Sequence, residues 1–200
     1  MAEVKAEKHQ MNLAMDSDVL ASDVDAVMDR GSPLYYSLIK AISEQARPFL
    51  NPGSRVVDLF SNGGQWIEQL EKEAAFRCRF LSFNSTEEQK ERCKDVMRMG
   101  IHLGNVAEFK MDMETEFPNV PSDLTLSVMG LSSFDSERRE QLMKEMSSHL
   151  QRRGAMIIVD RSIDVDGENI NWVKTMKDAG FKDCKTFWKT GDVCAWIANK

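Results

Sequence analysis

Residues 55–64 read Arg55-Val56-Val57-Asp58-Leu59-Phe60-Ser61-Asn62-Gly63-Gly64. The apolar run from Arg55 to Phe60 predicts a short buried β-strand, and the four residues after it predict a tight turn. A helix is expected directly after that turn, over residues 65–74. A strand, a glycine turn and a helix in this order are typical of the first unit of a parallel α/β sheet.

The same alternation of strands and helices continues along the chain. Further strands are predicted over residues 78–83, 106–111, 124–129 and 155–160. Helices are expected from Ser85, with Glu88 as its capping-box partner, to about residue 99, from Asp135 or Ser136 to Gly154, and over residues 169–179. Residues 182–189 and 193–198 flank a turn and predict a hairpin, whose strands are antiparallel. The sequence therefore predicts an α/β fold: a doubly wound, mostly parallel sheet of about seven strands with a C-terminal antiparallel hairpin strand.

The N-terminal part differs in composition from the rest of the chain. Residues 1–30 contain seven acidic and three basic residues, and a short helix capped by Ser17 is expected within them. Ser32-Pro33 then predicts the start of a longer helix. We expect an acidic segment over residues 1–30, partly helical or flexible, and one domain over residues 31–200.

The composition excludes several classes of protein. Of the 200 residues, 42% are hydrophobic and 29% are charged, which excludes a collagen-like, low-complexity or wholly disordered chain. No apolar run approaches the length of a membrane span, and residues 1–10 lack the apolar core of a secretion signal, so a cytoplasmic protein without a membrane partner is expected. The net charge of −6 disfavours strong non-specific binding of nucleic acid. The four cysteines form no CxxC pair, so we expect reduced thiols and no metal site.

Polar residues stand at the ends of four predicted strands, where ligands bind in sheets of this kind. Asp58 lies in the first strand before the glycine turn, Asn84 follows the second strand and Asp112 the third. The small polar group Gly130-Leu131-Ser132-Ser133 follows the fourth strand. Each has a simpler explanation as a turn, cap or loop residue, but their recurrence at four successive strand ends favours a ligand site.

The order of these residues resembles the class I S-adenosylmethionine-dependent methyltransferases over residues 30–200. The matching motifs are residues 55–64, Asn84, Asp112 and His149-Leu150-Gln151-Arg152-Arg153-Gly154-Ala155-Met156-Ile157-Ile158-Val159-Asp160. Within that superfamily the chain is most similar to the carboxy-S-adenosylmethionine synthase branch, which takes part in modification of the tRNA wobble uridine. That similarity rests on Asp29-Arg30-Gly31-Ser32-Pro33-Leu34-Tyr35-Tyr36, Glu91-Arg92-Cys93 and Asp178-Ala179-Gly180-Phe181. The resemblance implies a Rossmann-like methyltransferase domain over residues 31–200, with S-adenosylmethionine or S-adenosylhomocysteine as its small-molecule cofactor.

The resemblance also implies which residues hold this cofactor. Asp58 and Gly64 would line its methionine end, Asn84 would meet the ribose, and Asp112 with Met113 would meet the adenine. Gly130 and Ser132 would lie near the sulfonium, while Arg30 and Tyr35 would close over the amino acid. The full set of predicted cofactor residues is Arg30, Tyr35, Asp58, Phe60, Ser61, Gly63, Gly64, Asn84, Ser85, Asp112, Met113, Met129, Gly130 and Ser132.

The chain departs from the family pattern at three places. Phe60 replaces the first glycine of the turn motif. Asn84 replaces the ribose-binding acid, and an amide lacks the charge-assisted strength of a carboxylate. Only residues 161–168 separate the fifth strand from the next helix, where the synthase branch carries a long insert over its active site. The reaction that this branch catalyses is therefore not inferred for this chain.

The expected function is that of an S-adenosylmethionine-dependent methyltransferase acting on a small molecule or on an exposed group of a macromolecule. Asp135 and Asp160 lie near strand ends and are the candidates for a catalytic base, with a helix cap and a strand-end or loop acid as their simpler roles. Two alternatives stay open. One is a non-catalytic or accessory binding protein of the same fold, and the other is a carboxy-S-adenosylmethionine-synthase-like enzyme of tRNA modification. A homodimer or a protein partner is expected for either function.

Overall fold

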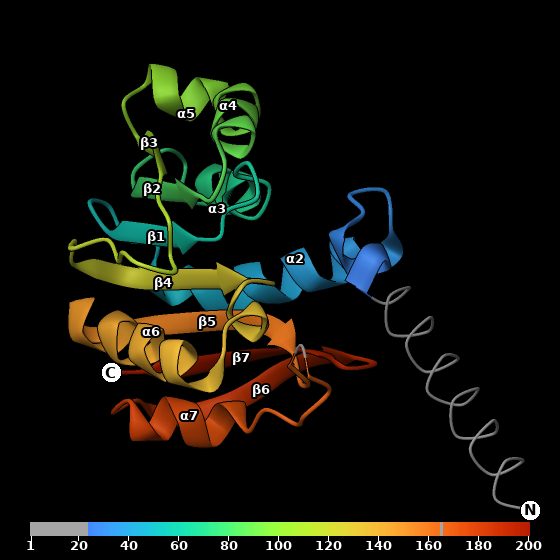
Figure 1. Ribbon diagram of the computed structural model, residues 1–200. Helices are drawn as coiled ribbons and strands as arrows, with labels where there is room; N and C mark the ends of the chain where they lie inside the picture. Colours follow the sequence, from blue (N-terminus) through green and yellow to red (C-terminus); the bar gives the residue numbers. More distant parts are fainter. Residues whose placement is uncertain (1–23, 165) are drawn as a thin grey trace, which may run out of the picture.

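The computed structural model describes residues 24–164 and 166–200, which contain one seven-stranded sheet (Figure 1). The strands are β1 (Arg55–Leu59), β2 (Arg79–Asn84), β3 (Val106–Lys110), β4 (Ser122–Val128), β5 (Leu150–Arg161), β6 (Lys182–Thr190) and β7 (Val193–Asn199). Their order is β3-β2-β1-β4-β5-β7-β6. Strands β1 to β5 pair in parallel, and β7 pairs antiparallel with β5 and β6. The predicted mostly parallel sheet with a C-terminal antiparallel hairpin is confirmed.

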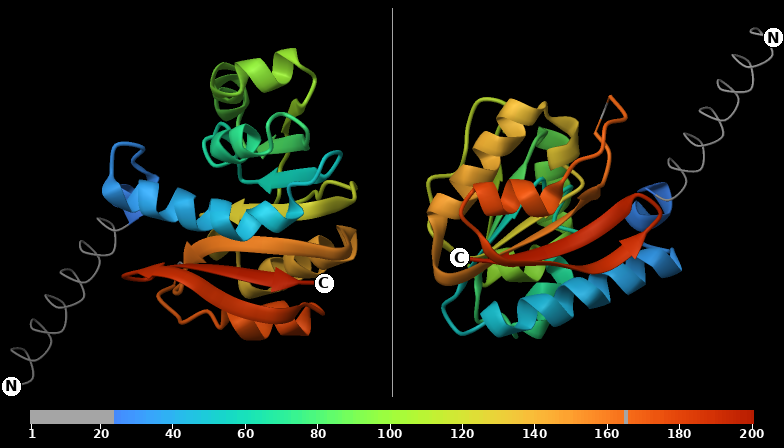
Figure 2. Two further views of the ribbon diagram at one scale, coloured as in Figure 1. Left: turned by 180° about the vertical axis from the view of Figure 1, so that it is seen from behind. Right: turned by 90° about the horizontal axis from the view of Figure 1, so that it is seen from below.

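Helices cover both faces of this sheet (Figures 1 and 2). They are α2 (Pro33–Ala46), α3 (Ile67–Glu73), α4 (Glu87–Val96), α5 (Arg98–His102), α6 (Ser136–His149) and α7 (Trp172–Asp178), with short 3-10 helices η1 (Arg47–Phe49) and η2 (Leu131–Ser133). One apolar core includes Leu38 of α2 and Leu70 of α3, and the other includes Met143 of α6. Val56 of β1 belongs to the first core and Val57 to the second, because successive residues of a strand face opposite sides.

The order of the strands reverses at β1, which pairs with β2 on one side and with β4 on the other. Loops that leave the carboxyl ends of β1 and β4 therefore diverge to opposite faces of the sheet. In open α/β sheets this divergence forms the crevice in which ligands bind. In Figure 1 the arrowheads of β1 and β4 point toward the edge at which the helical residues 24–28 lie.

The described part of the N-terminal segment packs onto the domain. Residues 24–28 are helical, and Val27 is fully buried in the same apolar core as Leu38. The rest of the predicted acidic segment, including the helix capped by Ser17, lies outside the described residues. The predicted start of α2 is confirmed, since the Ser32 hydroxyl accepts a hydrogen bond from the Leu34 amide at 3.1 Å and Pro33 is the first helical residue.

Two predicted helix boundaries are wrong. The capping box of α4 is formed by Thr86 and Gln89, whereas the sequence analysis expected Ser85 and Glu88. Thr86 caps the helix because its extended backbone immediately precedes the first helical residue. Gly154 does not end α6, but lies inside β5, which already begins at residue 150.

The described residues provide neither a membrane span nor a clustered metal site. Every helix within residues 24–164 and 166–200 is too short or too polar to cross a membrane. No group of three or more His, Cys, Asp or Glu side chains in these ranges is placed to hold a metal ion. The four cysteines are free thiols, and Cys78, Cys93 and Cys194 are buried.

Candidate functional site

The turn after β1 has a left-handed backbone at most of its positions. Phe60, Asn62, Gly63 and Gly64 have φ angles of 57°, 45°, 80° and 81°. Gly64 packs closely against Met97, the residue that follows α4. A Cβ added to Gly64 would stand 2.9 Å from Met97 Cγ. Phe60 and Asn62 carry side chains at φ values that non-glycine residues adopt uncommonly, and both side chains line a cavity.

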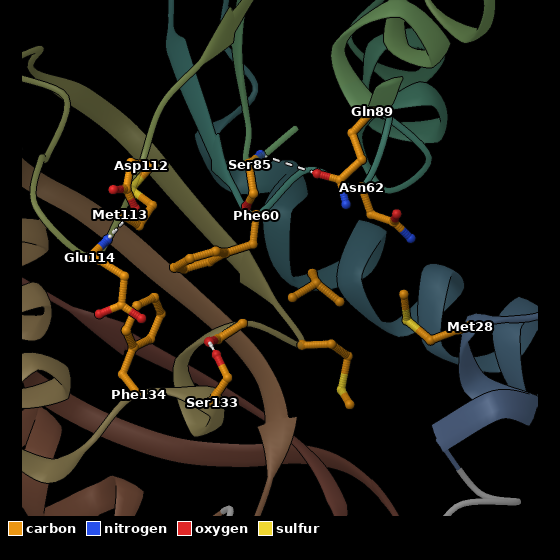
Figure 3. Close-up of a pocket in the computed structure, with 13 residues that line it drawn as sticks. Met28, Phe60, Asn62, Ser85, Gln89, Asp112, Met113, Glu114, Ser133 and Phe134 are labelled. Atoms are coloured by element: carbon orange, nitrogen blue, oxygen red, sulfur yellow. Dashed lines mark hydrogen bonds between the residues drawn. The ribbon is translucent and has the colours of Figure 1, made fainter. Parts of the chain in front are cut away.

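This cavity of about 520 Å³ lies beyond the carboxyl ends of β1, β2 and β4 (Figure 3). Its volume falls within the range of small-molecule sites. Figure 3 shows the Phe60 ring extending across the middle, with Ser85 on one side and Ser133 and Phe134 on the other. The residues that line the cavity are Met28, Phe60, Asn62, Ser85, Gln89, Asp112, Met113, Glu114, Val128, Met129, Gly130, Ser133 and Phe134. Six of the predicted cofactor residues are brought together here: Phe60, Ser85, Asp112, Met113, Met129 and Gly130.

The loop after β3 presents an oriented carboxylate to the cavity. Asp112 accepts hydrogen bonds from the Glu114 amide at 3.0 Å and from the Thr115 hydroxyl at 3.2 Å. The Arg138 guanidinium, from α6, donates to the Met113 carbonyl oxygen at 2.8 and 2.6 Å. These bonds fix the loop, so Asp112 is positioned before any ligand binds.

The amide side chain of Gln89 lies across the cavity from this loop. Its Oε1 accepts hydrogen bonds from the backbone amides of Ser85 at 3.1 Å and Thr86 at 3.3 Å. The Nε2 group is therefore the part of Gln89 that is available to donate to a ligand.

Asp58, expected at the methionine end of the cofactor, lies instead beneath the turn and does not line the cavity. Its side chain is fully buried, and neither carboxylate oxygen has a hydrogen-bond partner within the described residues. Burial raises the pKa of Asp58 to about 7, and the nearby Ser61 hydroxyl offsets only part of this rise. Asp58 is thus a buried carboxyl group that holds a proton more readily than an ordinary aspartate.

Asn84, expected at the ribose, is also withdrawn from the cavity, with 1% of its surface exposed. Its Oδ1 accepts a hydrogen bond from the Gly63 amide at 3.1 Å, and its Nδ2 donates to Ser82 Oγ at 3.1 Å and to the Phe109 carbonyl oxygen at 3.5 Å. These contacts use the amide to hold the turn after β1 against β2 and β3. The acidic residue of the family pattern is therefore replaced here by an asparagine whose side chain stabilises the turn after β1 from within the protein.

The two candidate bases are both bound to the protein's own backbone. Asp135 caps α6 by accepting a hydrogen bond from the Arg138 amide at 2.8 Å. Asp160 is fully buried at the end of β5 and does not line the cavity. Its Oδ2 accepts hydrogen bonds from the amides of Gly130, Leu131 and Ser132. Burial raises the pKa of Asp160, while the Ser132 hydroxyl and the backbone hydrogen bonds act in the opposite direction.

Arg30 and Tyr35 lie at a different place from the main cavity. They line a separate cavity of about 200 Å³ between α2 and α3. Arg30 forms an ion pair with Glu68, and the Tyr35 hydroxyl donates to the Gln65 carbonyl oxygen at 3.1 Å. Of the remaining predicted residues, Ser61, Gly63, Gly64 and Ser132 shape the two loops without lining the main cavity.

Seven lining residues were not among the predicted cofactor residues: Met28, Asn62, Gln89, Glu114, Val128, Ser133 and Phe134. A signal existed for Asn62, which stands between Phe60 and Gly64 in the glycine turn motif. Glu114 stands two residues after Asp112, so the set of residues predicted in this loop could have been extended to include it. Met28 carries no such signal, because only the fold brings residues 24–28 to this edge of the sheet.

The cavity suits an adenosyl compound with a sulfonium group. Apolar surfaces of Phe60, Met113 and Phe134 can contact a flat base, while Ser85 and Gln89 offer polar contacts. The carboxylates of Asp112 and Glu114 give the lining a negative character that suits a cationic ligand. The residues present therefore fit S-adenosylmethionine, with Asn84 as the departure described above.

Comparison with proteins of known sequence finds a distant relative. No protein-family model matches this chain. Over 143 residues, 71% of the chain, it is 21% identical to a carboxy-S-adenosyl-L-methionine synthase of Methylococcus capsulatus. The chain spans 59% of the length of that relative.

Solved structures resemble the chain more extensively. An O-methyltransferase family protein of Burkholderia thailandensis superposes with a TM-score of 0.63 and 13% identity, over 84% of this chain and 59% of that one. Human N-acetylserotonin methyltransferase in complex with SAM superposes with a TM-score of 0.60 and 13% identity, over 81% and 51% of the two chains. The chain thus has the fold of these methyltransferase structures, as the resemblance implied.

Proposed function

We propose that this protein is an S-adenosylmethionine-dependent methyltransferase that acts on a small molecule or on an exposed group of a macromolecule. The observation that carries the proposal is the cavity at the reversal point of a methyltransferase-type sheet, lined together by Phe60, Ser85, Asp112 and Met113. These four residues come from three different strand ends, and the sequence resemblance assigned all of them to the cofactor.

The lining suggests a division of roles. Asp112 and Met113 would hold the adenine side, with Asp112 already oriented by Glu114 and Thr115. Phe60, Met129 and Phe134 would exclude water from the centre of the cavity. When bound, S-adenosylmethionine supplies a methyl group on a positively charged sulfur, which needs little further activation.

Glu114 is the carboxylate best placed to take a proton from an acceptor. Its side chain lines the cavity, as that of Phe134 does (Figure 3). Asp135 and Asp160 are bound to backbone amides instead. An acceptor with a dissociable proton would therefore transfer it to a Glu114 oxygen.

Calorimetric titration with S-adenosylmethionine and S-adenosylhomocysteine, followed by incubation with methyl-labelled cofactor and candidate acceptors, tests the proposal. We expect micromolar dissociation constants and transfer of the label to an acceptor. A folded protein that binds neither compound would overturn the proposal. Binding without transfer to any acceptor would favour the accessory binding protein instead.

The proposals on cellular location, tRNA modification and protein partners rest on the resemblance and on composition. We propose a cytoplasmic location, and the resemblance to the synthase branch supports the alternative of a role in tRNA modification. Cell fractionation and analysis of wobble uridines in a deletion strain would test these two points separately. A homodimer or protein partner is tested by light scattering of the purified chain.

A further inference from the structure

Four backbone amides surround the carboxylate of Asp160, and the Ser132 hydroxyl lies close to it. Its Oδ2 accepts from Gly130 at 3.2 Å, Leu131 at 2.8 Å and Ser132 at 3.2 Å, and its Oδ1 accepts from the Arg161 amide at 2.8 Å. Three consecutive amides that converge on one oxygen form an anion-binding concavity. Here a fully buried side chain of the protein itself fills that concavity.

The loop held in this way forms part of the cavity wall. Met129 has a left-handed backbone with φ of 54°, which turns the chain sharply at the end of β4. Met129 and Gly130 then line the cavity, and Gly130 supports the Phe60 ring. The amide of Met129 is itself held by the Val159 carbonyl oxygen at 2.7 Å, so β5 fixes this loop at consecutive residues.

We infer that Asp160 is a positioning residue, which holds residues 129–132 in the shape that the cofactor cavity requires. This inference rests on the proposed function, because it concerns the same cavity. Without the carboxylate, the buried amides of Gly130 and Leu131 and the partly buried amide of Ser132 lose their acceptor, and a buried amide without a partner favours a different loop conformation. Asp160 acts through Met129 and Gly130 and does not contact the ligand.

Two substitutions separate this role from general stability. In Asp160→Asn, either orientation of the side-chain amide places an NH2 group against a backbone amide, because both carboxylate oxygens accept hydrogen bonds. Asp160→Ala leaves the concavity open to a small added anion such as formate. Asp135→Ala is the matched control, since Asp135 also accepts from a backbone amide but lies at an exposed helix cap.

Calorimetry of the folded variants gives the readout. We expect the dissociation constant for S-adenosylmethionine to rise about tenfold in both Asp160 variants, as for loss of one charge-assisted hydrogen bond. Formate should restore much of the affinity of Asp160→Ala and leave Asp160→Asn, Asp135→Ala and the wild type unchanged. Unchanged affinity in the folded Asp160 variants, or no effect of formate on Asp160→Ala, would overturn the inference. A wild type that binds no cofactor would instead remove the proposed function itself.

A measurement on the wild type remains decisive if both variants fail to fold. Amide hydrogen exchange should be slow at Gly130, Leu131 and Ser132 in the protein without ligand. Exchange at these amides as fast as in an open loop would show that Asp160 does not hold them, and would overturn the inference without any substitution.

Discussion

The ring of Phe60 lies directly against the backbone of Gly130, although the two residues follow different strands of the sheet. A Cβ built on Gly130 would stand 2.3 Å from Cγ of Phe60, well inside any van der Waals contact. The Phe60 ring also meets Phe134, with ring centroids 5.6 Å apart and planes inclined by 49°. This contact ties the turn after β1 to the loop after β4 and defines the centre of the candidate cofactor cavity.

Substitution Gly130→Ala tests this contact. The added methyl group must displace the Phe60 ring, and we expect a loss of about 1–3 kcal/mol in the free energy of unfolding, as for overpacking. Thermal and denaturant unfolding measure it. Gly31→Ala is the control, because its Cβ would meet only Asp29 side-chain atoms at 3.4 Å or more. Phe60→Ala combined with Gly130→Ala should recover part of the loss, and strict additivity of the two substitutions would contradict the contact.

Substitution Asp58→Asn tests the buried carboxyl group. The folded-state pKa of Asp58 is raised from 3.8 to about 7, so the folded protein keeps a proton that the unfolded chain releases. Wild-type stability should therefore fall as the pH rises between these two values and then level off. We expect Asp58→Asn to be more stable than the wild type at pH 8, by about 4 kcal/mol at most, and of similar stability near pH 4.

The difference in the free energy of unfolding between Asp58→Asn and the wild type is the quantity to follow, because burial also raises the pKa of Glu71 to about 7. Glu71 therefore contributes to the pH dependence of both proteins. Denaturant unfolding at several pH values provides it. A difference that does not depend on pH would show that the Asp58 carboxyl group titrates as an ordinary aspartate.

Substitution Asn84→Asp restores the acid found at this position in the family pattern. In this structure the new oxygen would face Ser82 Oγ and the Phe109 carbonyl oxygen, where the Asn84 amide now donates. We expect a loss of about 1–3 kcal/mol in stability and no gain in affinity for S-adenosylmethionine. Asn62→Asp is the control, since Asn62 lines the cavity. Tighter cofactor binding by Asn84→Asp would mean that this side chain reaches the ribose after all.

Arg30→Ala and Asp112→Asn form a contrasting pair. Arg30 is paired with Glu68 beside a separate cavity, so its removal should leave the dissociation constant for S-adenosylmethionine within about twofold of the wild type. Asp112 lines the main cavity, and loss of its charge should weaken binding about tenfold. Calorimetry on both variants measures this. The reverse order of effects would move the cofactor to the cavity between α2 and α3.

The architecture was predictable because it follows from local patterns. Apolar runs marked each parallel strand, a glycine turn marked the end of β1, and Thr190-Gly191-Asp192 marked the antiparallel hairpin between β6 and β7. The depth of a side chain within the crevice has no such local signal. Asp58 and Asn84 sit at the predicted strand ends, yet both side chains are buried under the turn. The Asn84 amide bonds to Gly63 and Ser82 there, whereas the Asp58 carboxyl group has no hydrogen-bond partner among the described residues.

The site was predictable in part for the same reason. Phe60, Asp112 and Gly130 were found because they follow strands that end at one edge of the sheet. Met28 reaches the cavity from the helical residues 24–28, which follow no predicted strand, so only tertiary packing could reveal it. The role of Asp160 was likewise hidden, because a strand-end acid and a catalytic acid have the same sequence pattern.

A crystal structure of the protein grown with S-adenosylhomocysteine tests the central claim most directly. The account predicts density for the adenosyl group in the cavity beside Phe60, with the adenine next to Asp112 and Met113 and with Asn84 still bound to Gly63. Density for the compound at any other place, or a main cavity without it at saturating concentration, would contradict the claim.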